Sequence, residues 1–380
     1  MSKPVFSRRD WLKFAGAGVA SSALVGCASW LPRSYSRPLS AQPFARPQIG
    51  EDLIIRTRVG LRPFRPSGFN VKGEKFGEKL VIHNYGHGGA GITLSWGSSM
   101  LAVREMPDIA DRRAAVLGCG VMGLSTARLL QARGWQVTIY AKDLPPNTTS
   151  NVAGGLWAPT SVHRLHLETP EFAAQLSEAL TLSHAEFSKL VGGGYGVSWR
   201  EDYYLSRGPL QPQDFYYLER WPALFPSIAV LSPDEHPFAA PFVMRHLTLL
   251  IEPSIYLPRM VQDVRDAGGN IVVREMQSLG EVLALDEPVV FNCTGLGARD
   301  LFGDAELLPV RGQLVFMPAD SRVDYCTHGS GEGLLYMFPR EDGILLGGTY
   351  EYGATHLEPD AETTARIVRE HLRLSRGMRV

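Results

Sequence analysis

The stretch over residues 114–140 constrains the fold of this chain more than any other segment. A short apolar strand over residues 114–117 runs into the motif Gly118-x-Gly120-x-x-Gly123, which is followed by a helix expected over residues 122–133 and a second strand over residues 136–140. One βαβ unit of this length is typical of a mononucleotide-binding half. The sequence therefore predicts an α/β fold with a parallel, Rossmann-like sheet.

Each glycine of this motif has a physical task. Gly118 permits the tight turn after the strand, Gly120 lets the backbone approach a pyrophosphate, and Gly123 lets the helix pack closely on the strand. The helix N-terminus then stabilises the phosphate charge. Asp143, beside Lys142, stands about 20 residues further on, where an acid holds ribose hydroxyls. The motif by itself does not choose between NAD and FAD.

Composition limits the class of protein. The chain has 380 residues and a net charge of −1, which gives no sign of a nucleic-acid-binding surface. The 39 glycines fit a fold whose backbone must approach a cofactor closely. After Cys27, the cysteines Cys119, Cys293 and Cys326 have neither paired nor metal-type spacing, so we expect them to be buried apolar residues.

The first residues resemble an export signal. Ser7-Arg-Arg-Asp-Trp-Leu-Lys13 matches the twin-arginine pattern, and the apolar run over residues 14–25 is too short for a lasting membrane span. Leu24-Val-Gly-Cys27 resembles a bacterial lipobox and predicts lipidation of Cys27, with cleavage after Ala28 as the alternative. We expect residues 1–28 to be a signal peptide, residues 29–50 a tether, and the folded protein to be exported to the periplasmic side of a bacterial membrane.

Apolar patterns predict further elements around the βαβ unit. Strands are expected at residues 53–55, 80–83, 270–273 and 289–292, and helices at residues 93–103, 170–191, 255–267 and 361–374. Pro63 and Pro66 exclude a regular helix over residues 56–69. The short apolar runs within residues 197–251 and the runs over residues 313–317, 335–338 and 344–347 predict antiparallel strands. The predicted fold is a parallel nucleotide-binding sheet interleaved with an antiparallel sheet.

Five further segments carry distinctive motifs: residues 147–159, Asn292-Cys-Thr-Gly295, Arg311-Gly-Gln313, Tyr336-Met-Phe-Pro339 and Leu346-Gly-Gly348. They resemble the D-amino-acid oxidase family of FAD-dependent oxidoreductases. Arg62-Pro-Phe-Arg-Pro66 and the block over residues 83–93, which begins His83-Asn-Tyr-Gly-His-Gly-Gly, are similar to that family's C-terminal signature. The resemblance covers nearly all of residues 51–374. It implies a Rossmann-like FAD-binding domain and an antiparallel-sheet substrate domain, both discontinuous in sequence.

The resemblance also implies roles for single residues. Arg62 would bind the substrate α-carboxylate, Tyr336 would donate its hydroxyl to the same group, and the Gly89 carbonyl would accept from the amine, whereas Arg65 is expected to be structural. Without the resemblance, such an arginine more often faces solvent and such a tyrosine is more often core. The residues implied in non-covalent FAD binding are Gly88, Gly91, Ile92, Thr93, Gly118, Gly120, Val121, Met122, Gly123, Lys142, Asp143, Thr148, Thr149, Ser150, Gly154, Gly155, Leu156, Met276, Cys293, Thr294 and Gly295.

The order of the segments differs from that family. There the nucleotide fingerprint comes first and the histidine–glycine block closes the chain, whereas here residues 51–104 precede the fingerprint. We therefore expect a circular permutation, which a fold with neighbouring termini tolerates. The expected FAD-binding domain comprises residues 77–195 and 254–300, and the substrate domain residues 51–76, 196–253 and 301–366. Residues 367–380 are expected to form a closing helix and tail.

Two departures from the family leave the preferred side chain open. Its animal members carry a lid tyrosine, but the corresponding residues 328–335 hold Glu332 and no tyrosine at that position, and a substrate-facing glutamine corresponds to Ala158. Metal binding is not expected, because His83 and His87 flank a glycine turn without a carboxylate or cysteine companion nearby in the sequence. We interpret both histidines as hydrogen-bonding locally.

The resemblance implies an oxidase of D-amino acids. Hydride transfer to flavin N5, hydrolysis of the imino acid and reoxidation by dioxygen would give a 2-oxo acid, ammonia and hydrogen peroxide. The expected partners are a D-amino acid, dioxygen or another electron acceptor, and the membrane through the lipid anchor. Three alternatives remain: a membrane-attached amino-acid dehydrogenase, an oxidase of glycine or N-methylated amino acids, and a non-catalytic flavin-binding lipoprotein.

Overall fold

The computed structural model describes residues 44–211, 216–331 and 333–379. The predicted export signal, the lipobox with Cys27, most of the tether, and Glu332 lie outside the described residues. Within the described part of the chain, no helix has the length and apolar character needed to cross a bilayer.

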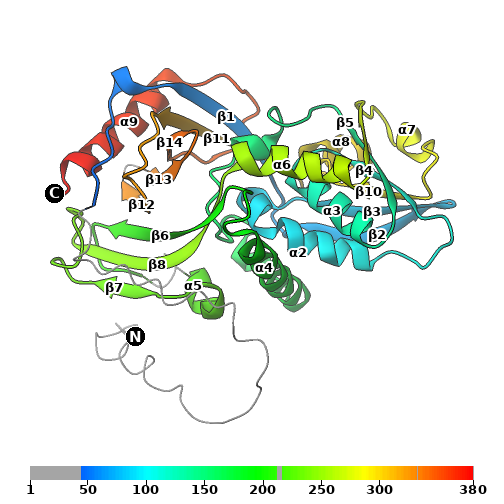
Figure 1. The fold of residues 1–380 in the computed structure, drawn as a ribbon, viewed down its shortest axis with the longest axis horizontal. Helices are drawn as coiled ribbons and strands as arrows, with labels where there is room; N and C mark the ends of the chain where they lie inside the picture. Colours follow the sequence, from blue (N-terminus) through cyan, green and yellow to red (C-terminus); the bar gives the residue numbers. More distant parts are fainter. Residues whose placement is uncertain (1–43, 212–215, 332, 380) are drawn as a thin grey trace, which may run out of the picture. The chain divides into compact units, whose positions relative to one another are not determined.

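Six strands form the predicted parallel sheet, in the order β2-β3-β10-β4-β5-β9 (Figure 1). These strands are β2 (Asn70–Phe76), β3 (Lys79–Tyr85), β4 (Arg113–Leu117), β5 (Gln136–Ala141), β9 (Asn270–Val273) and β10 (Val289–Asn292). All described neighbours in this sheet pair in parallel except β2 and β3. β10 is buried along its whole length, and its apolar run without alternation reflects a strand covered on both faces.

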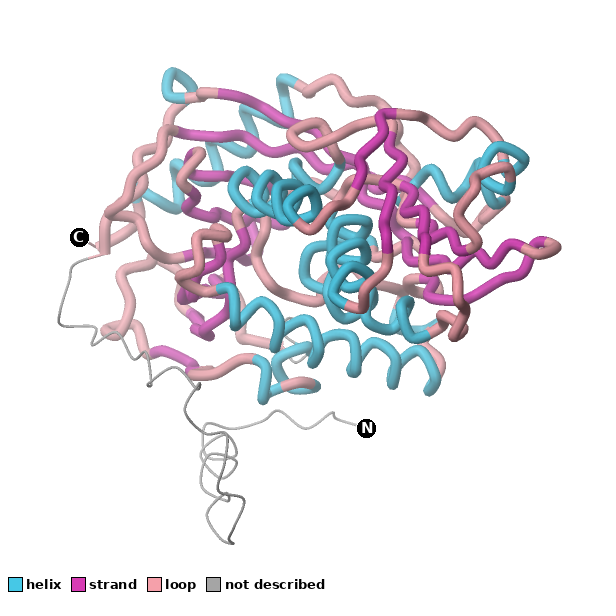
Figure 2. The backbone as a smooth tube through the Cα atoms, turned by 45° about the vertical axis from the view of Figure 1, so that its right-hand side comes forward, coloured by secondary structure: helices cyan, strands magenta, loops and turns pink. Residues whose placement is uncertain are grey.

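Helices cover this sheet (Figure 2). They are α2 (Gly91–Arg104), α3 (Val121–Ala132) and α6 (Pro253–Asp266), and α4 (Pro170–Leu190) packs against α2, which also contacts α3. Gly97 makes the approach of α2 to α4 possible, because a Cβ there would overlap the backbone of Ala179. α4 begins where the Thr169 side chain accepts from the Phe172 N–H and Pro170 opens the first turn.

Nine strands form the larger, mostly antiparallel sheet, in the order β1-β11-β14-β13-β12-β6-β8-β7 with β15 against β11. They are β1 (Arg56–Phe64), β6 (Val197–Ser206), β7 (Ala229–Leu231), β8 (Phe242–Ile251), β11 (Leu308–Met317), β12 (Cys326–Gly331), β13 (Gly333–Arg340), β14 (Gly343–Gly347) and β15 (Glu351–Tyr352). The closing helix α9 (Ala361–Arg376) packs against β11, β13 and β14.

The remaining helices are short. They are α5 (Tyr216–Arg220), α7 (Leu279–Leu283), α8 (Ala298–Phe302) and the 3₁₀ turns Glu51–Leu53, Gly88–Ala90, Thr149–Val152, Leu165–Leu167, Pro222–Leu224 and Gly295–Gly297.

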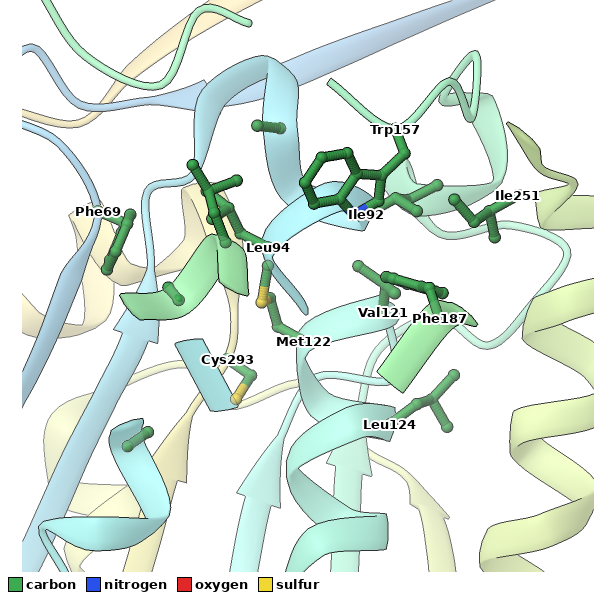
Figure 3. Close-up of a cluster of buried hydrophobic side chains, with 14 of the residues drawn as sticks. Phe69, Ile92, Leu94, Val121, Met122, Leu124, Trp157, Phe187, Ile251 and Cys293 are labelled. Atoms are coloured by element: carbon green, nitrogen blue, oxygen red, sulfur yellow. The ribbon is translucent and has the colours of Figure 1, made fainter. Parts of the chain in front are cut away.

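One apolar core joins the helices to both sheets (Figure 3). Ile92 of α2, Val121 of α3 and Ile251 of β8 belong to it together with Trp157, whose indole is fully buried. Each fully buried side chain of this size stabilises the fold by about 1.5–3 kcal/mol relative to exposure. The core therefore fixes the two sheets around the space between them.

The first and last described residues lie side by side. Arg46 donates to the Met378 carbonyl at 2.7 Å, and the Ser375 hydroxyl donates to the Pro47 carbonyl at 2.7 Å. The two ends of the fold are thus neighbours although 332 positions separate Arg46 from Met378.

The predicted α/β class with one parallel and one antiparallel sheet is confirmed, and β9 and β10 have the predicted bounds. The prediction of a strand over residues 53–55 is wrong, because a 3₁₀ turn ends at Leu53 and β1 begins at Arg56. β2 was not predicted, since its Asn-Val-Lys-Gly-Glu-Lys-Phe sequence is that of a charged edge strand. Because β2 pairs with β3, residues 70–76 belong to the six-stranded sheet. The prediction that assigned all of residues 51–76 to the substrate domain is therefore wrong for residues 70–76.

Candidate functional site

A cavity of about 1160 Å³ lies between the two sheets. The carboxyl ends of β4 and β10 and the turn over residues 86–93 form one part of its wall, and β1, β11, β12 and β13 contribute the other. Every residue that the sequence assigned to substrate or FAD lines this cavity except Gly123. Ligands of open parallel sheets bind at this edge, beyond the carboxyl ends of the strands.

The glycine motif of residues 118–123 lies at one end of the cavity. Gly118 has φ +99°, and a Cβ on Gly123 would overlap the Gly118 carbonyl, so Gly123 serves helix–strand packing beneath the wall. A Cβ on Gly120 would meet only the Ser150 hydroxyl, at 3.0 Å, and otherwise point into open space. The N-cap residue of α3 is Gly120, which has no side chain to cap the helix, and Ser150 Oγ accepts from the Val121 N–H. This helix end can therefore receive an anionic group.

Lys142 and Asp143 follow β5 at the rim of the cavity. Lys142 forms an exposed ion pair with Glu275 at 3.6 Å, a contact of small energetic weight. Met276, which is nearly buried, continues this wall. The acid expected at ribose distance thus lies at the cavity, beside a lysine that is paired with Glu275.

A second set of backbone contacts holds the opposite end of the cavity. Gly88 has φ +56°, and a Cβ there would overlap the Ser161 carbonyl, to which the Gly89 N–H donates at 3.2 Å. The Thr93 hydroxyl donates to the Ala158 carbonyl at 3.1 Å and accepts from the Ala158 N–H at 3.2 Å. The glycine-rich turn and the segment around Ala158 are therefore locked together, and Thr93 acts there through its side chain.

Arg62 and Tyr336, predicted from the sequence to act together, meet in this cavity. Arg62 Nη2 donates to the Tyr336 hydroxyl at 3.5 Å, and Nη1 donates to the Thr349 carbonyl at 3.3 Å. The guanidinium carbon of Arg62 lies 4.2 Å from the centroid of the Tyr350 ring. A cation–π contact of this kind stabilises by about 0.5–2 kcal/mol and covers one face of the guanidinium.

Two glycines make room for this pair. A Cβ on Gly312 of β11 would overlap the Arg62 guanidinium, and a Cβ on Gly347 of β14 would overlap the Tyr336 ring. Both side chains therefore lie directly on the backbone of the larger sheet. Burial raises the pKa of Tyr336, which the positive charge of Arg62 opposes, so the phenol is neutral and can donate.

Arg65 has the structural contacts expected of it. Its Nε donates to Asp304 at 3.0 Å, and its Nη2 pairs with Glu306 at 2.8 Å. It does not line the cavity, in contrast to Arg62 three residues earlier.

The two histidines of the glycine block differ from one another. His83 contacts Glu74 at 3.3 Å and Asn292 at 3.1 Å, as the expected local hydrogen bonding requires. The same expectation is wrong for His87: its ring stacks on Phe69 at 4.8 Å, and its Nε2 has no partner among the described residues. Burial lowers the pKa of His87 to about 3, so the ring is neutral.

No group of three or more His, Cys, Asp or Glu in the described part of the chain could hold a metal ion.

The chain is similar in sequence to known FAD-dependent oxidoreductases. The family model described as FAD dependent oxidoreductase matches residues 113–377. The chain belongs to this family. The D-amino-acid oxidase of Streptomyces coelicolor is 35% identical over 269 residues, 70% of this chain and 78% of that protein. The D-aspartate oxidase of Homo sapiens is 30% identical over 262 residues, 67% of this chain and 74% of that protein.

A solved structure supports the fold. The glycine oxidase of Geobacillus kaustophilus matches with a TM-score of 0.54 at 17% identity, over 69% of this chain and 78% of that chain. FAD is therefore the cofactor of this oxidoreductase, and the residues fit it: a Gly120 Cβ would intrude on the open space beside α3, and the cavity continues from there to Arg62. The family match begins with β4, so β1 and α2, which supply Arg62 and Thr93, lie outside it.

The sequence reasoning missed several residues of the cavity. Tyr350 covers Arg62, and its only signal was its position two residues after Gly348 of a motif that the resemblance had singled out. His328, Tyr204 and Tyr217 also line the cavity, and no local pattern marks them. They come together only through the pairing of β12 with β6 and the placement of α5.

Proposed function

We propose that this chain is an FAD-dependent D-amino-acid oxidase, which converts D-amino acids to 2-oxo acids, ammonia and hydrogen peroxide. The observation that carries the proposal is the pairing of Arg62 with Tyr336 in the same cavity as the nucleotide-binding glycines. A planar guanidinium next to a neutral phenol suits a carboxylate, which accepts hydrogen bonds from both. The name of the Streptomyces coelicolor relative supports the same reading.

The residues of the site would act by binding and orientation. Arg62 and Tyr336 hold the α-carboxylate, and the Gly89 carbonyl accepts from the amine, so that two points of attachment and the cavity wall fix which face of Cα is presented. The flavin, when bound, supplies the hydride acceptor and the reaction with dioxygen. A substrate whose amine arrives neutral requires no side-chain base, and the chain's task is then to align the reacting groups and exclude water.

The test uses the purified protein with bound FAD under anaerobic conditions. D-amino acids should bleach the visible flavin band and L-isomers should not. Arg62→Ala should keep its flavin while kcat/KM falls about 10²- to 10⁴-fold, because two charge-assisted hydrogen bonds of about 1.5–3 kcal/mol each are lost. Arg58→Ala is the matched control, since Arg58 lies on the same strand and is exposed. Equal turnover of Arg62→Ala and the parent protein would contradict the proposal.

The electron acceptor is decided by a separate measurement. An oxidase consumes one dioxygen and releases one hydrogen peroxide for each D-amino acid oxidised, which an oxygen electrode and a peroxidase assay record. Reduction of the flavin without oxygen uptake, restored by a quinone analogue, would favour an amino-acid dehydrogenase instead.

We also propose that the chain is exported by the twin-arginine route and attached to a membrane through Cys27. The sequence Ser7-Arg-Arg-Asp-Trp-Leu-Lys13 and the lipobox-like Leu24–Cys27 support this, since they occur in the order and spacing of such signals. Replacement of Arg8 and Arg9 by lysine should keep the protein in the cytoplasm, and Cys27→Ser should release the exported form from membranes. Unchanged fractionation of both variants would refute the proposal.

We further propose that the segment order is a circular permutation of the family's. Support comes from the neighbouring ends at Arg46 and Met378 and from a family match that begins at residue 113. A chain that starts at Arg113, continues through Met378 and a short Gly/Ser linker to Phe44, and ends at Arg104 should fold, bind FAD and retain kcat/KM. Loss of flavin binding with every linker length would contradict it.

A further inference from the structure

The larger sheet contains a buried carboxylate that contacts a residue lining the cavity. Asp202 lies on β6 and is fully buried. Its Oδ2 is 2.7 Å from Nδ1 of His328 on β12 and 3.6 Å from Nε2 of His246 on β8. The three side chains come from adjacent strands, and neither Arg nor Lys pairs with Asp202 in the part of the chain that the structure describes.

The charge of this cluster is set by burial. Moving a carboxylate out of water costs several kcal/mol unless an opposite charge or several donors replace the water. His246 is fully buried and its pKa is lowered to about 4, so it is neutral and cannot supply that charge. Burial alone would raise the pKa of Asp202, but the contact with His328 outweighs it and the pKa is lowered. Burial therefore favours an Asp202–His328 pair without net charge, in which one proton is held between Oδ2 and Nδ1.

His328 stands between Asp202 and the cavity. One edge of its ring, Nδ1, is turned to Asp202, while the side chain retains 16% of its exposure and lines the cavity. Whichever of the two groups holds the shared proton, the other ring nitrogen, Nε2, carries a hydrogen, so the second edge of the ring is a donor. Asp202 thus fixes the direction in which His328 can donate.

The sheet places this donor directly beside the carboxylate clamp. His328 is the register partner of Tyr336 on β13 on one side and of Tyr204 on β6 on the other. Residues that face each other across an antiparallel pair, as His328 and Tyr336 do, point to the same side of the sheet with Cβ atoms about 4.5–5.5 Å apart. The carboxylate clamp consists of Arg62 on β1 and Tyr336 on β13. His328 lies on the next strand, β12, on the side of Tyr336 that is away from Arg62.

Among the described residues, the surroundings of His328 supply aromatic surface. The Tyr204 ring lies 5.0 Å from the His328 ring, and Tyr217 of α5 lines the same part of the cavity. Burial raises the pKa of Tyr217 well above its usual range, so its phenol is neutral. A substrate held at Arg62 through its α-carboxylate can extend its side chain over Tyr336 toward these groups.

We propose that His328, oriented by Asp202, determines the side-chain specificity of the enzyme by donating a hydrogen bond to an oxygen acceptor in the substrate side chain. This inference rests on the D-amino-acid oxidase activity proposed above. D-amino acids with a side-chain carboxamide or carboxylate oxygen are the favoured class. D-leucine, which matches the shape of D-asparagine, leaves the donor unpaired, and D-lysine brings an ammonium group, which can only donate and cannot accept from it.

The test compares D-asparagine, D-aspartate, D-leucine and D-lysine as reductants of the bound flavin. In the parent protein kcat/KM for D-asparagine should exceed that for D-leucine by about 10- to 100-fold, the cost of leaving one buried donor unpaired. D-lysine should be the poorest of the four. The ratio of D-aspartate to D-asparagine then separates the two oxygen sources, the charged and the neutral one.

Two variants assign the effect to the pair. His328→Leu should remove the preference of D-asparagine over D-leucine, mainly through KM for the polar substrate, and keep the flavin spectrum. Asp202→Asn keeps the shape of the side chain and should lower the same ratio by a comparable factor. The double variant should add little, because Asp202 is a positioning residue that acts through His328. His328→Gln, which retains a donor, should restore part of the preference and serves if Asp202→Asn does not fold.

The outcomes separate this inference from the proposed activity. Equal D-asparagine to D-leucine ratios in the parent protein and His328→Leu, with D-isomers still bleaching the flavin, would overturn the role of His328 alone. A parent flavin that no D-amino acid reduces would overturn both.

Discussion

We expect the free energy of unfolding to fall in acid, because several buried histidines are neutral. His184 is the residue best suited to test this expectation. His184 lies on α4 between Trp157 and Trp199, with ring centroids 5.0 and 5.8 Å away, and its Nε2 is buried without a partner among the described residues. Burial lowers the pKa of His184 to about 4. Since the unfolded value is near 6.5, the unfolded chain binds the proton first, and stability is lost as the pH falls from about 6.5 toward 4.

The size of the effect follows from the two pKa values. Between pH 7.5 and 5.5, one histidine with these values lowers the free energy of unfolding by about 1.4 kcal/mol. His87 and His246, whose pKa values are lowered to about 3 and about 4, should each act by a similar amount. Together the three should remove about 4 kcal/mol over this interval, a large part of a typical domain's stability of about 5–15 kcal/mol.

His184→Phe keeps the aromatic contacts and removes one titrating group. Urea unfolding at pH 7.5, 6.5 and 5.5, at a fixed concentration of FAD and followed by tryptophan fluorescence, should give a loss of stability about 1.4 kcal/mol smaller than in the parent protein. His166→Phe, at an exposed position, should leave the loss unchanged. The reasoning is refuted if His184→Phe and the parent lose the same stability between pH 7.5 and 5.5.

Three further substitutions probe the cavity. Gly123→Ala should lower FAD affinity about 10-fold or more, measured by fluorescence quenching of added FAD, because its Cβ would push α3 off the Gly118 carbonyl at a strain of about 1–3 kcal/mol. Gly347→Ala should displace the Tyr336 ring and reduce kcat/KM for D-amino acids while the flavin spectrum persists; Gly343→Ala, which faces the Met317 backbone, is the control that should destabilise the fold without selective loss of substrate binding. Tyr350→Leu should raise KM about 3- to 30-fold, because Arg62 loses a cation–π contact of about 0.5–2 kcal/mol, and an unchanged KM would exclude that role.

The nucleotide-binding half could be predicted from the sequence because its signals are local. The strand, the glycines and the helix of residues 114–133 are contiguous, and the positive φ of Gly118 and the close packing at Gly123 agree with the steric reasons given for them. β10 was predicted with the bounds Val289–Asn292, because a short apolar run without alternation is typical of a strand that is covered on both faces. The edge strand β2 was not predicted, because its lysines and its glutamate are also typical of a loop.

The substrate side of the cavity could be predicted only where a motif resembled a known family. Arg62 and Tyr336 were found in this way, and both lie at the cavity. The Asp202–His328 pair carries no such signal, because 126 positions separate the two residues and only the parallel pairing of β6 with β12 joins them. Periodicity shows which residues share a face of one strand, but not which strand lies beside it.

The glycines of the larger sheet then acquire a physical meaning that the sequence alone did not supply. Gly312 and Gly347 are the spaces into which Arg62 and Tyr336 fit, so the two motifs that contain these glycines and the two that contain the side chains form one unit. Arg62 stands on β1, whereas its glycine stands on β11, the neighbouring strand, 250 positions later. A side chain larger than glycine at position 312 would have to expel the guanidinium. The clamp therefore depends as much on what β11 and β14 lack as on what β1 and β13 provide.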